Sequence, residues 1–290
     1  MLSVELLQAL DDVIWLGSEA QAADLSHCNQ STICRRARQA ARLFSIELVK
    51  INHEWRIATP CTLLSLERHV HQLFRFQSNA RLRLESDHWV GQQFGPYLPG
   101  GWIHGKPRRI GIEKPMRLLD DRVLDAWISS TISDLPEGDD PKYRVYQLAQ
   151  MPVEIACSSD HPLIHIKQLS QGDLLQFPSL ALPFHLYPNF SRQMQSVGLW
   201  TETATMRSYD FTQWEARAMA SLTTIPINVL STHANAQLTS LDFEIGINDC
   251  VALVVRRDMA EQAAVQALLE ALQRWLAHVA INKPALTITS

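Results

Sequence analysis

The spacing of apolar residues changes once along this chain, near residue 80, and the change predicts two parts of different architecture. Before it, apolar residues recur three or four positions apart, as in Leu63, Leu66, Val70 and Leu73, which is typical of helices. After Arg81, runs typical of strands alternate with helical stretches. Because strands that alternate with helices usually form parallel sheets covered by helices, we expect mostly parallel sheets there. The sequence therefore predicts a helical N-terminal part followed by a larger α/β part.

Residues 1–58 carry the signals of short helices followed by a β-hairpin. A first amphipathic helix is expected to stop at Gly17, and Ser18 can cap the next one. Asn29 is a second candidate cap, and it opens a helix that continues to about Phe44. Residues 49–57 are expected to form two strands around the polar turn at residues 52–54.

The helix after Asn29 combines an apolar face with an opposite basic face. At 100° per residue, the apolar face holds Ile33, Ala37, Ala40 and Phe44, and the basic face holds Ser31, Arg35, Arg38 and Arg42. A helix of this kind can enter the major groove of DNA and hold phosphates with its arginines. A solvated arginine face is the alternative, but the preceding helix and the following hairpin favour DNA binding.

The expected DNA contacts come from this helix and from the hairpin. Base contacts are expected from Gln30, Ser31, Thr32 and Arg35, and phosphate contacts from Arg36, Arg38, Lys50 and Arg56, with His53 of the hairpin touching the backbone or the minor groove.

Residues 59–80 are expected to form one linker helix. The 3 and 4 spacing of Leu63, Leu66, Val70 and Leu73 fits the seam of a two-stranded coiled coil, and it equally fits a helix packed on its own domain. Its position between two domains favours a role in dimerisation.

Eight strands and five helices are expected beyond residue 80. The strands are expected over residues 81–86, 108–113, 124–129, 153–158, 179–183, 203–209, 225–230 and 250–256, and the helices over residues 87–96, 115–123, 188–197, 211–222 and 259–279. A break near residues 158–162 could join two α/β subdomains.

Several predicted strands end in residues that could bind a ligand, because ligands collect at the carboxyl ends of strands in open α/β sheets. The candidate effector-binding residues are Ser86, Asp87, Ser129, Ser130, Thr131, Pro183, Phe184, His185, Ser208 and Thr223. The alternative for each is a structural role, since Ser86 and Asp87 could simply cap a helix and residues 129–131 could form an ordinary loop.

The bulk composition excludes several classes of protein. A net charge of -4 over 290 residues argues against a wholly basic nucleic-acid coat protein, but not against one local basic surface. No secretory leader or stretch of about 18 apolar residues is present, so a cytoplasmic protein without membrane contact is expected. The five cysteines are expected to be free thiols, although a thiol switch between Cys157 and Cys250 is an alternative. No metal site, cofactor or catalytic residue is assigned, because neither a phosphate loop nor a nucleophile elbow nor a His-Glu-x-x-His helix occurs.

The chain resembles the LysR-type transcriptional regulators. The resemblance is carried by Gly17-Ser18, by Ala22-Ala23, by the run Asn29-Gln30-Ser31-Thr32-Ile33-Cys34-Arg35-Arg36, by Trp55-Arg56-Ile57-Ala58-Thr59-Pro60 and by Ser159-Asp160-His161-Pro162-Leu163. It implies an α/β protein with an N-terminal winged helix-turn-helix, a linker helix and a two-subdomain effector domain like a periplasmic binding protein.

The resemblance also implies domain limits and partners. The expected domains are residues 1–58 for DNA binding, 59–80 for the linker and dimerisation helix, and 81–290 for effector binding, with subdomain I at about 81–157 and 257–290 and subdomain II at about 162–256. Double-stranded DNA, a small-molecule effector such as a carboxylate, and self-association as a dimer or tetramer are expected.

We therefore predict a non-enzymatic, sequence-specific regulator controlled by a small molecule. The alternative is a DNA-binding regulator without such a ligand, controlled by a protein partner, its oligomeric state or cysteine oxidation.

Overall fold

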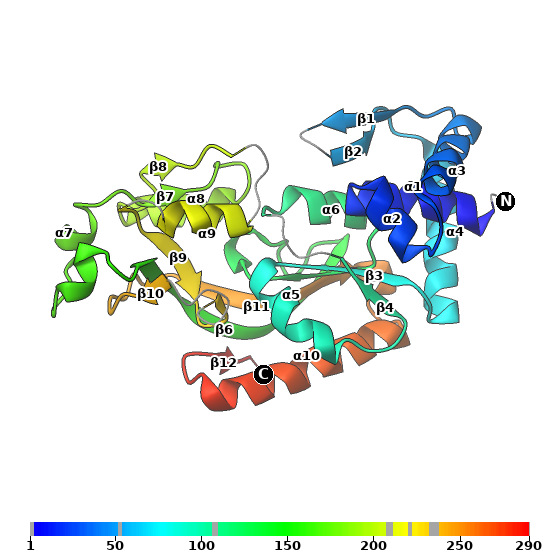
Figure 1. Cartoon of the computed structure of the whole chain (residues 1–290). Helices are drawn as coiled ribbons and strands as arrows, with labels where there is room; N and C mark the ends of the chain where they lie inside the picture. Colours follow the sequence, from blue (N-terminus) through cyan, green and yellow to red (C-terminus); the bar gives the residue numbers. More distant parts are fainter. Residues whose placement is uncertain are drawn as a thin grey trace. The chain divides into compact units, whose positions relative to one another are not determined.

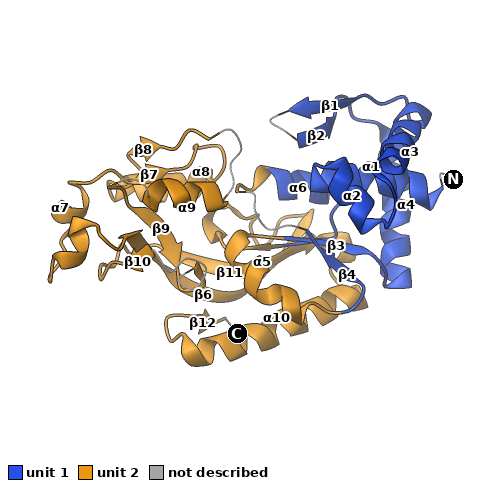
Figure 2. Cartoon of the chain, in the orientation of Figure 1, with its two compact units in different colours: residues 1–85, 100–106, 114–127 blue, residues 86–99, 107–113, 128–290 orange. Residues whose placement is uncertain are grey.

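The computed structural model describes residues 3–51, 54–105, 110–206, 211–219, 222–231 and 238–289. Its contacts divide the chain into two compact units, which Figure 2 shows in different colours. Unit 1 comprises residues 1–85, 100–106 and 114–127, and unit 2 comprises residues 86–99, 107–113 and 128–290.

Unit 1 begins with three helices and a hairpin, drawn in blue in Figure 1. The elements are α1 (Val4–Leu16), α2 (Glu19–Leu25), α3 (Gln30–Leu43), β1 (Leu48–Ile51) and β2 (Glu54–Ile57). The two strands pair antiparallel, and their register runs from Leu48 opposite Ile57 to Ile51 opposite Glu54. The predicted succession of short helices and a hairpin is confirmed.

The junction between α1 and α2 follows from two residue types. Gly17 adopts a φ of 68°, a left-handed conformation that suits glycine, and its N–H bonds the carbonyl of Val13 at 2.9 Å. Ser18 then caps α2, because its Oγ accepts a bond from the N–H of Gln21 at 3.4 Å. Ala22 and Ala23 are both buried, so α2 can pack closely on its neighbours.

The rest of unit 1 consists of the linker helix and the short elements packed with it. These are α4 (Thr62–Ser78), β3 (Leu82–Ser86), β4 (Trp102–His104) and α6 (Glu113–Asp120). The last residue of β3, Ser86, and the first residue of α6, Glu113, are assigned to unit 2. Strands β3 and β4 are parallel, with Leu82 opposite Trp102.

The strand predicted over residues 108–113 is wrong in its described part. Residues 110–112 form no strand, and α6 begins at Glu113. The reason is local, because Pro115 lies in the first turn of α6, where a proline needs no N–H partner and its fixed φ suits a helix.

Unit 2 holds most of the α/β part. Its helices are α5 (His88–Phe94), α7 (Gln171–Leu174), α8 (Pro188–Ser196), α9 (Phe211–Met219) and α10 (Ala263–Asn282), and its 3₁₀ turns are η1 (Gly95–Tyr97), η2 (Ile132–Asp134), η3 (Pro162–His165) and η5 (Arg257–Met259). Its strands are the end of β5 (Ala126–Ser129), β6 (Tyr143–Ser158), β7 (Leu180–Ala181), β8 (Glu202–Thr203), β9 (Ile225–Asn228), β10 (Leu238–Ser240), β11 (Asn248–Arg256) and β12 (Thr287–Ile288).

Strand β6 organises unit 2. It has 16 residues and pairs antiparallel with β9, β10, β11 and β12 (Figure 1). Only β7 and β8 form a parallel pair among the strand pairings described within unit 2. The expectation of mostly parallel sheets is therefore wrong for this unit, because alternation along the chain predicts which elements follow one another and not which distant strands pair.

A buried network of charges joins three elements of unit 1. Asp11 and Asp12 of α1 are 1% and 0% exposed, and Asp125, just before β5, is 0% exposed. Their partners are Arg68 of α4, whose Nη2 lies 2.8 Å from Asp11, and Arg83 of β3, whose Nη2 lies 2.9 Å from Asp12. Both arginines are 3% exposed, so the network excludes most water.

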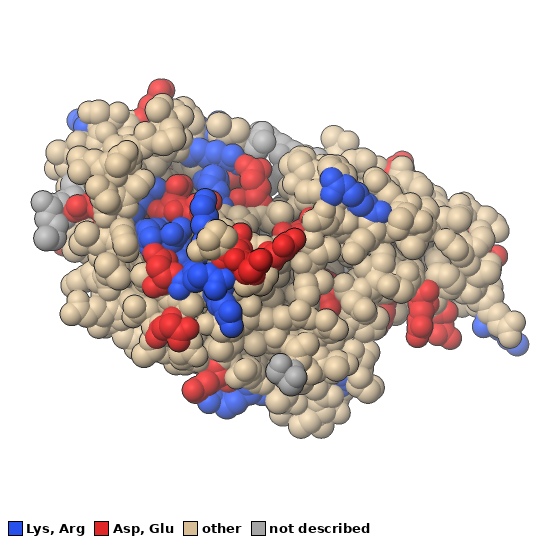
Figure 3. Space-filling model, turned by 180° about the vertical axis from the view of Figure 1, so that it is seen from behind, with Lys and Arg blue, Asp and Glu red and all other residues tan. Residues whose placement is uncertain are grey.

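Asp125 receives hydrogen bonds from both α4 and β3. Arg75 donates to its two carboxylate oxygens at 3.0 and 2.8 Å, Gln72 donates at 3.0 Å, and the backbone N–H of Arg83 donates at 2.9 Å. Burial by itself lowers the pKa of Arg83, but the carboxylates of Asp12, Asp11 and Asp125 outweigh it and raise that pKa, so the guanidinium stays charged. On the face of the molecule that Figure 3 shows, basic and acidic side chains lie interleaved in one region.

Replacing Asp125→Asn should destabilise unit 1 by about 3–5 kcal/mol, because the change leaves the buried guanidinium of Arg75 without its counter-charge. Urea-induced unfolding of the full chain, followed by circular dichroism, measures the effect. Glu270→Gln is the control, since Glu270 pairs with Arg274 on an exposed part of α10 and its loss should leave the unfolding curve unchanged. A shift for Asp125→Asn no larger than that of the control would contradict the importance given to this network.

Candidate functional site

The exposed face of α3 carries the residues predicted to touch DNA. Its inner face is buried through Ile33, Ala37 and Ala40, which confirms the predicted orientation of the helix, while Phe44 is only half-buried. The opposite face presents the exposed residues Gln30, Ser31, Arg35, Arg38 and Arg42, together with the half-buried Thr32.

Some of the predicted phosphate-binding residues already have acidic neighbours. Arg36 pairs with Glu5 at 2.8 Å, and Arg56 pairs with Glu54 at 3.3 Å. Lys50 is exposed and its Nζ lies 5.4 Å from the ring centre of Trp55. His53 lies outside the described residues.

Gln30 has a contact of its own. Its side-chain amide donates to Glu19 of α2 at 3.3 Å, between two exposed groups. Because exposed pairs contribute little to stability, Gln30 can give up this contact at little cost.

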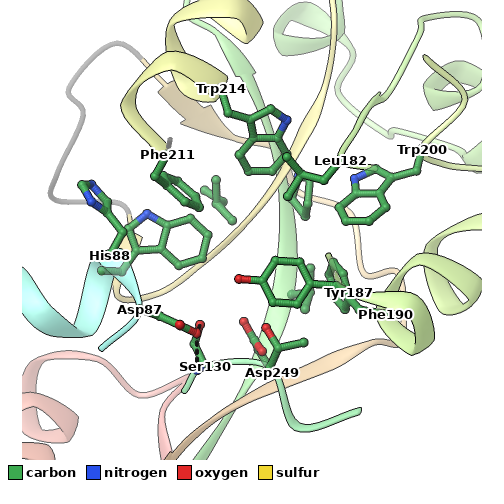
Figure 4. A pocket seen from close by; sticks show the side chains of 15 residues that line it. Asp87, His88, Ser130, Leu182, Tyr187, Phe190, Trp200, Phe211, Trp214 and Asp249 are labelled. Carbon is green, nitrogen blue, oxygen red and sulfur yellow. Dashed lines mark hydrogen bonds between the residues drawn. The ribbon is translucent and has the colours of Figure 1, made fainter. Parts of the chain in front are cut away.

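Unit 2 contains a partly open pocket, shown in Figure 4. Its cavity volume is about 50 Å³, well below the range of about 300–1,000 Å³ usual for small-molecule sites. The lining residues come from the turns after β3 and β5, from β6, β9 and β11, from α5, α8 and α9, and from the segments after β7 and α8. They are Asp87, His88, Trp89, Ser130, Thr131, Val153, Leu182, Tyr187, Phe190, Trp200, Phe211, Trp214, Pro226, Ile227 and Asp249.

The structure brings three of the predicted effector-binding residues into the lining, namely Asp87, Ser130 and Thr131. Ser129 adjoins them through its bond to Asp87. The other described candidates do not line the pocket: Ser86 and Thr223 are buried elsewhere, Pro183 is half-buried, and Phe184 and His185 are exposed. Ser208 lies outside the described residues.

Asp87 occupies the hydrogen-bond donors of the β5 turn. Its Oδ2 accepts from the backbone N–H of Ser130 at 2.7 Å, from Ser130 Oγ at 2.9 Å and from Ser129 Oγ at 3.4 Å. Ser129 and Ser130 are the residues at the end of a predicted strand that the sequence analysis expected to bind an effector. A carboxylate of the protein itself therefore fills that position.

Asp249 of β11 is the second carboxyl group of the pocket. It is 6% exposed, its Oδ2 accepts from Asn228 Nδ2 at 3.0 Å, and its Oδ1 has no hydrogen-bond partner among the described residues. Burial is the main cause that raises its pKa to about 8, the charge of Asp87 adds to the rise, and the bond from Asn228 opposes it.

Tyr187 lies beside these carboxyl groups. Its hydroxyl accepts from the backbone N–H of Gly111 at 3.0 Å, and burial together with the nearby Asp87 raises its pKa well above the ordinary value. The phenol therefore stays protonated and can donate a hydrogen bond into the pocket.

Aromatic rings form the remaining walls, and the sequence argument missed them. Phe211 stacks on His88 with ring centres 5.0 Å apart and meets Trp214 edge-on at 5.3 Å. Phe190 meets Trp200 edge-on at 5.2 Å. One signal was available, because Phe211 and Trp214 lie three residues apart on a predicted helix and so share a face.

The five cysteines are free thiols of different burial. Cys157 and Cys250 are completely buried. Burial raises the pKa of Cys157 to about 11 and raises that of Cys250 as well, so both stay thiols rather than reactive thiolates. Within the described ranges, no group of three or more His, Cys, Asp or Glu side chains is arranged to hold a metal ion.

Among the helices in the described part of the chain, none combines the length and the apolar character that a membrane span needs.

Comparison with known proteins gives a family and a fold. Residues 111–277 match the model of the LysR substrate binding domain. A search of curated proteins gave no match.

Solved structures resemble the chain over nearly its whole length. A full-length OxyR variant from Pseudomonas aeruginosa has a TM-score of 0.58 at 13% identity, and the match covers 94% of this chain and 95% of that one. CbnR, a LysR family transcriptional regulator, has a TM-score of 0.55 at 13% identity, covering 94% and 99%. Full-length CbnR in complex with its target DNA has a TM-score of 0.53 at 14% identity, covering 94% and 100%.

Burial of Asp249 should make stability fall as pH rises. Its pKa of about 8 in the folded protein lies above the ordinary value of about 3.9, so the folded state binds the extra proton between these values and loses that advantage as pH rises. Replacing Asp249→Asn should remove a slope of up to about 1.4 kcal/mol per pH unit in the free energy of unfolding between roughly pH 5 and pH 8.

Urea unfolding at several pH values measures that slope. Asp242→Asn is the matched control, because Asp242 is exposed and does not line the pocket. Parallel pH profiles for the wild type and Asp249→Asn would show that Asp249 is not held protonated.

Proposed function

This chain belongs to the LysR-type transcriptional regulators, and we propose that it binds specific DNA sequences through α3 and the β1–β2 hairpin under the control of a small molecule in the pocket of unit 2. The exposed polar and basic face of α3 is the observation that carries the proposal. Gln30 and Ser31 at its N-terminal end suit base edges, and Arg35 and Arg38 in the next turns suit bases or phosphates.

The residues proposed to bind DNA differ in whether an acidic side chain already pairs with them. Arg35, Arg38 and Lys50 form no ion pair with an acidic side chain among the described residues, so they can reach DNA directly. Arg36 and Arg56 must each exchange a carboxylate for a phosphate. We therefore assign the larger share of phosphate binding to Arg38 and Lys50.

Self-association through α4 is the second element of the proposal. Leu63, Leu66, Val70 and Leu73 are between 43% and 61% exposed, and the opposite face of the helix is buried through Leu64 and the charged network. An exposed apolar stripe at 3 and 4 spacing supports a coiled-coil seam with a second copy. Two recognition helices then meet successive half-sites on DNA, which adds specificity that one helix lacks.

We retain the domain limits of 1–58, 59–80 and 81–290 as part of the proposal, with the subdomain limits given above, and we place the protein in the cytoplasm, in keeping with its free cysteines. An effector that binds one arrangement of the effector domain better than another shifts the population toward it.

The alternative, control by cysteine oxidation, has little support because the thiols of Cys157 and Cys250 are buried and protonated. Control by a protein partner has no described feature in its favour.

Selection of genomic fragments by the purified full chain, followed by footprinting at near-physiological salt, tests the proposal. A protected palindrome with half-sites about one helical turn apart supports a dimeric regulator. A chain that enriches no fragment over bulk DNA would refute specific DNA binding by the chain alone.

Arg38→Ala should weaken binding to all DNA sequences similarly and flatten the dependence of log K on log salt by about one unit, because it removes one phosphate contact. Gln30→Ala should instead relax the preference at one base position. Fluorescence anisotropy over a salt series measures both effects. The control is Arg274→Ala on α10, whose side chain is equally charged and exposed but lies in unit 2; an equal loss with this control would contradict the assigned interface.

Leu66→Glu should shift the chain toward the monomer, since it introduces a charge in the middle of the apolar stripe of α4. Light scattering coupled to size-exclusion chromatography measures the mass. Ile281→Glu is the control, because Ile281 is 77% exposed on α10, outside the stripe. An unchanged mass for Leu66→Glu would place the dimer interface elsewhere.

A further inference from the structure

We propose that Glu19 of α2 is a positioning residue for DNA recognition: it fixes the side-chain amide of Gln30, so that Gln30 selects adenine and rejects guanine in the major groove. This inference rests on the proposed function, because it names the base that one of the assigned contacts reads. It is carried by the contacts of Glu19 with α3 and by the hydrogen-bonding groups that these contacts leave on Gln30.

The position of Glu19 follows from the local start of α2. Ser18 caps this helix, since its Oγ accepts from the N–H of Gln21 at 3.4 Å, and Glu19 is the first residue of the helix. Helices α2 and α3 pack against each other. The cap therefore determines where the carboxylate of Glu19 meets α3.

Two residues of α3, one turn apart, meet this carboxylate. Gln30 Nε2 donates to Glu19 Oε2 at 3.3 Å. Burial raises the pKa of Cys34, and the charge of Glu19 together with a hydrogen bond from the thiol to Glu19 raises it further, while the charge of Arg38 opposes the rise. Because Gln30 and Cys34 are four residues apart, they share one face of the helix. Glu19 is thus held against α3 at two successive turns.

The contact with Glu19 leaves Gln30 one donor and one acceptor for DNA. A glutamine amide carries two N–H groups and one carbonyl oxygen. Glu19 takes one N–H, and the Gln30 side chain makes no second hydrogen bond among the described residues. The remaining N–H and the oxygen match adenine, whose N7 accepts and whose N6 donates. Guanine presents two acceptors, N7 and O6, so the oxygen of Gln30 would face an acceptor there.

Glu19 also determines which way the amide of Gln30 faces. Rotation by about 180° around the last side-chain bond exchanges the nitrogen and the oxygen, and this rotation has two broad minima. Beside Glu19, the turned amide would place its oxygen against a carboxylate oxygen, so an attraction would become a repulsion between two acceptors. An exposed contact adds little to the stability of the fold, but a several-fold preference between two orientations needs no more.

The charge of Glu19 has a separate effect that does not depend on sequence. A carboxylate on the proposed DNA-binding surface repels phosphates, so it weakens binding to all DNA. Removing the charge should therefore raise the general affinity, whereas losing the contact with Gln30 should lower the preference at one base. An experiment must separate these two effects.

Matched variants make this separation. Gln30→Ala first identifies the base position that depends on Gln30, and fluorescence anisotropy at fixed salt then gives the affinities for adenine and guanine at that position. The wild type should prefer adenine by roughly 5- to 150-fold, the range of a good bidentate contact. Glu19→Gln should reduce this ratio by about threefold or more, because the new amide can either accept from or donate to Gln30 and no longer fixes its orientation.

Asp24→Asn is the control for charge. Asp24 is an exposed acidic residue of the same helix, and its side chain makes no hydrogen bond among the described residues. The substitution should raise the affinity for both bases alike and leave their ratio unchanged. In the Gln30→Ala background, Glu19→Gln should also leave the ratio unchanged, because no amide remains to be oriented.

Each other outcome overturns the inference. It is refuted by a wild type that does not prefer adenine over guanine, and by a ratio that Glu19→Gln changes no more than Asp24→Asn does. An equal change in the Gln30→Ala background would refute it as well, since Glu19 would then act on the base without Gln30. A chain that selects no DNA in the footprinting experiment refutes the proposed function and this inference together, whereas the results above, with selection intact, refute this inference alone.

Discussion

The arrangement of unit 1 depends on the buried ion pairs among α1, α4 and β3. Asp11 and Asp12 of α1 are held by Arg68 and Arg83, which belong to the other two elements. Because a buried charge that loses its partner is strongly unfavourable, these elements can separate only if several charges are rehydrated together. The apolar face of α3 packs in the same helical cluster as α1. The face of α3 proposed to read DNA is thereby tied to the helix that carries the proposed dimer seam.

Unit 2 uses buried carboxyl groups differently. Asp125 in unit 1 accepts bonds from Gln72, Arg75 and Arg83, so both of its oxygens are satisfied. Asp249 in unit 2 keeps one oxygen without a bond among the described residues and lies against a cavity. A carboxylate whose oxygens are all bonded stabilises a fold, whereas a buried polar atom without a hydrogen bond costs stability.

Sequence reasoning succeeded where local chemistry decides and failed where distant pairing decides. The end of α1 at Gly17 and the cap of α2 by Ser18 were predictable, because φ and capping depend on neighbouring residues. The part of β6 before residue 153 was missed, since Gln147 and Gln150 interrupt its apolar pattern and their place in the strand comes from pairing with β11 and β12. The missed pocket residues Tyr187, Trp200 and Asp249 come from segments that no local pattern connects.

By itself the sequence determined the helices other than α7, the orientation of α3 and the polar residues that follow the strands. The helical period places Arg35 and Arg38 opposite Ile33 and Ala37 whatever the rest of the chain does. Only the tertiary structure decided that Asp87 takes the donors of the Ser129–Ser130 turn and that aromatic rings from α8 and α9 face Asp249. The reason is physical: backbone geometry acts over a few residues, whereas the partner of a buried charge is chosen by the packing of segments far apart in the chain.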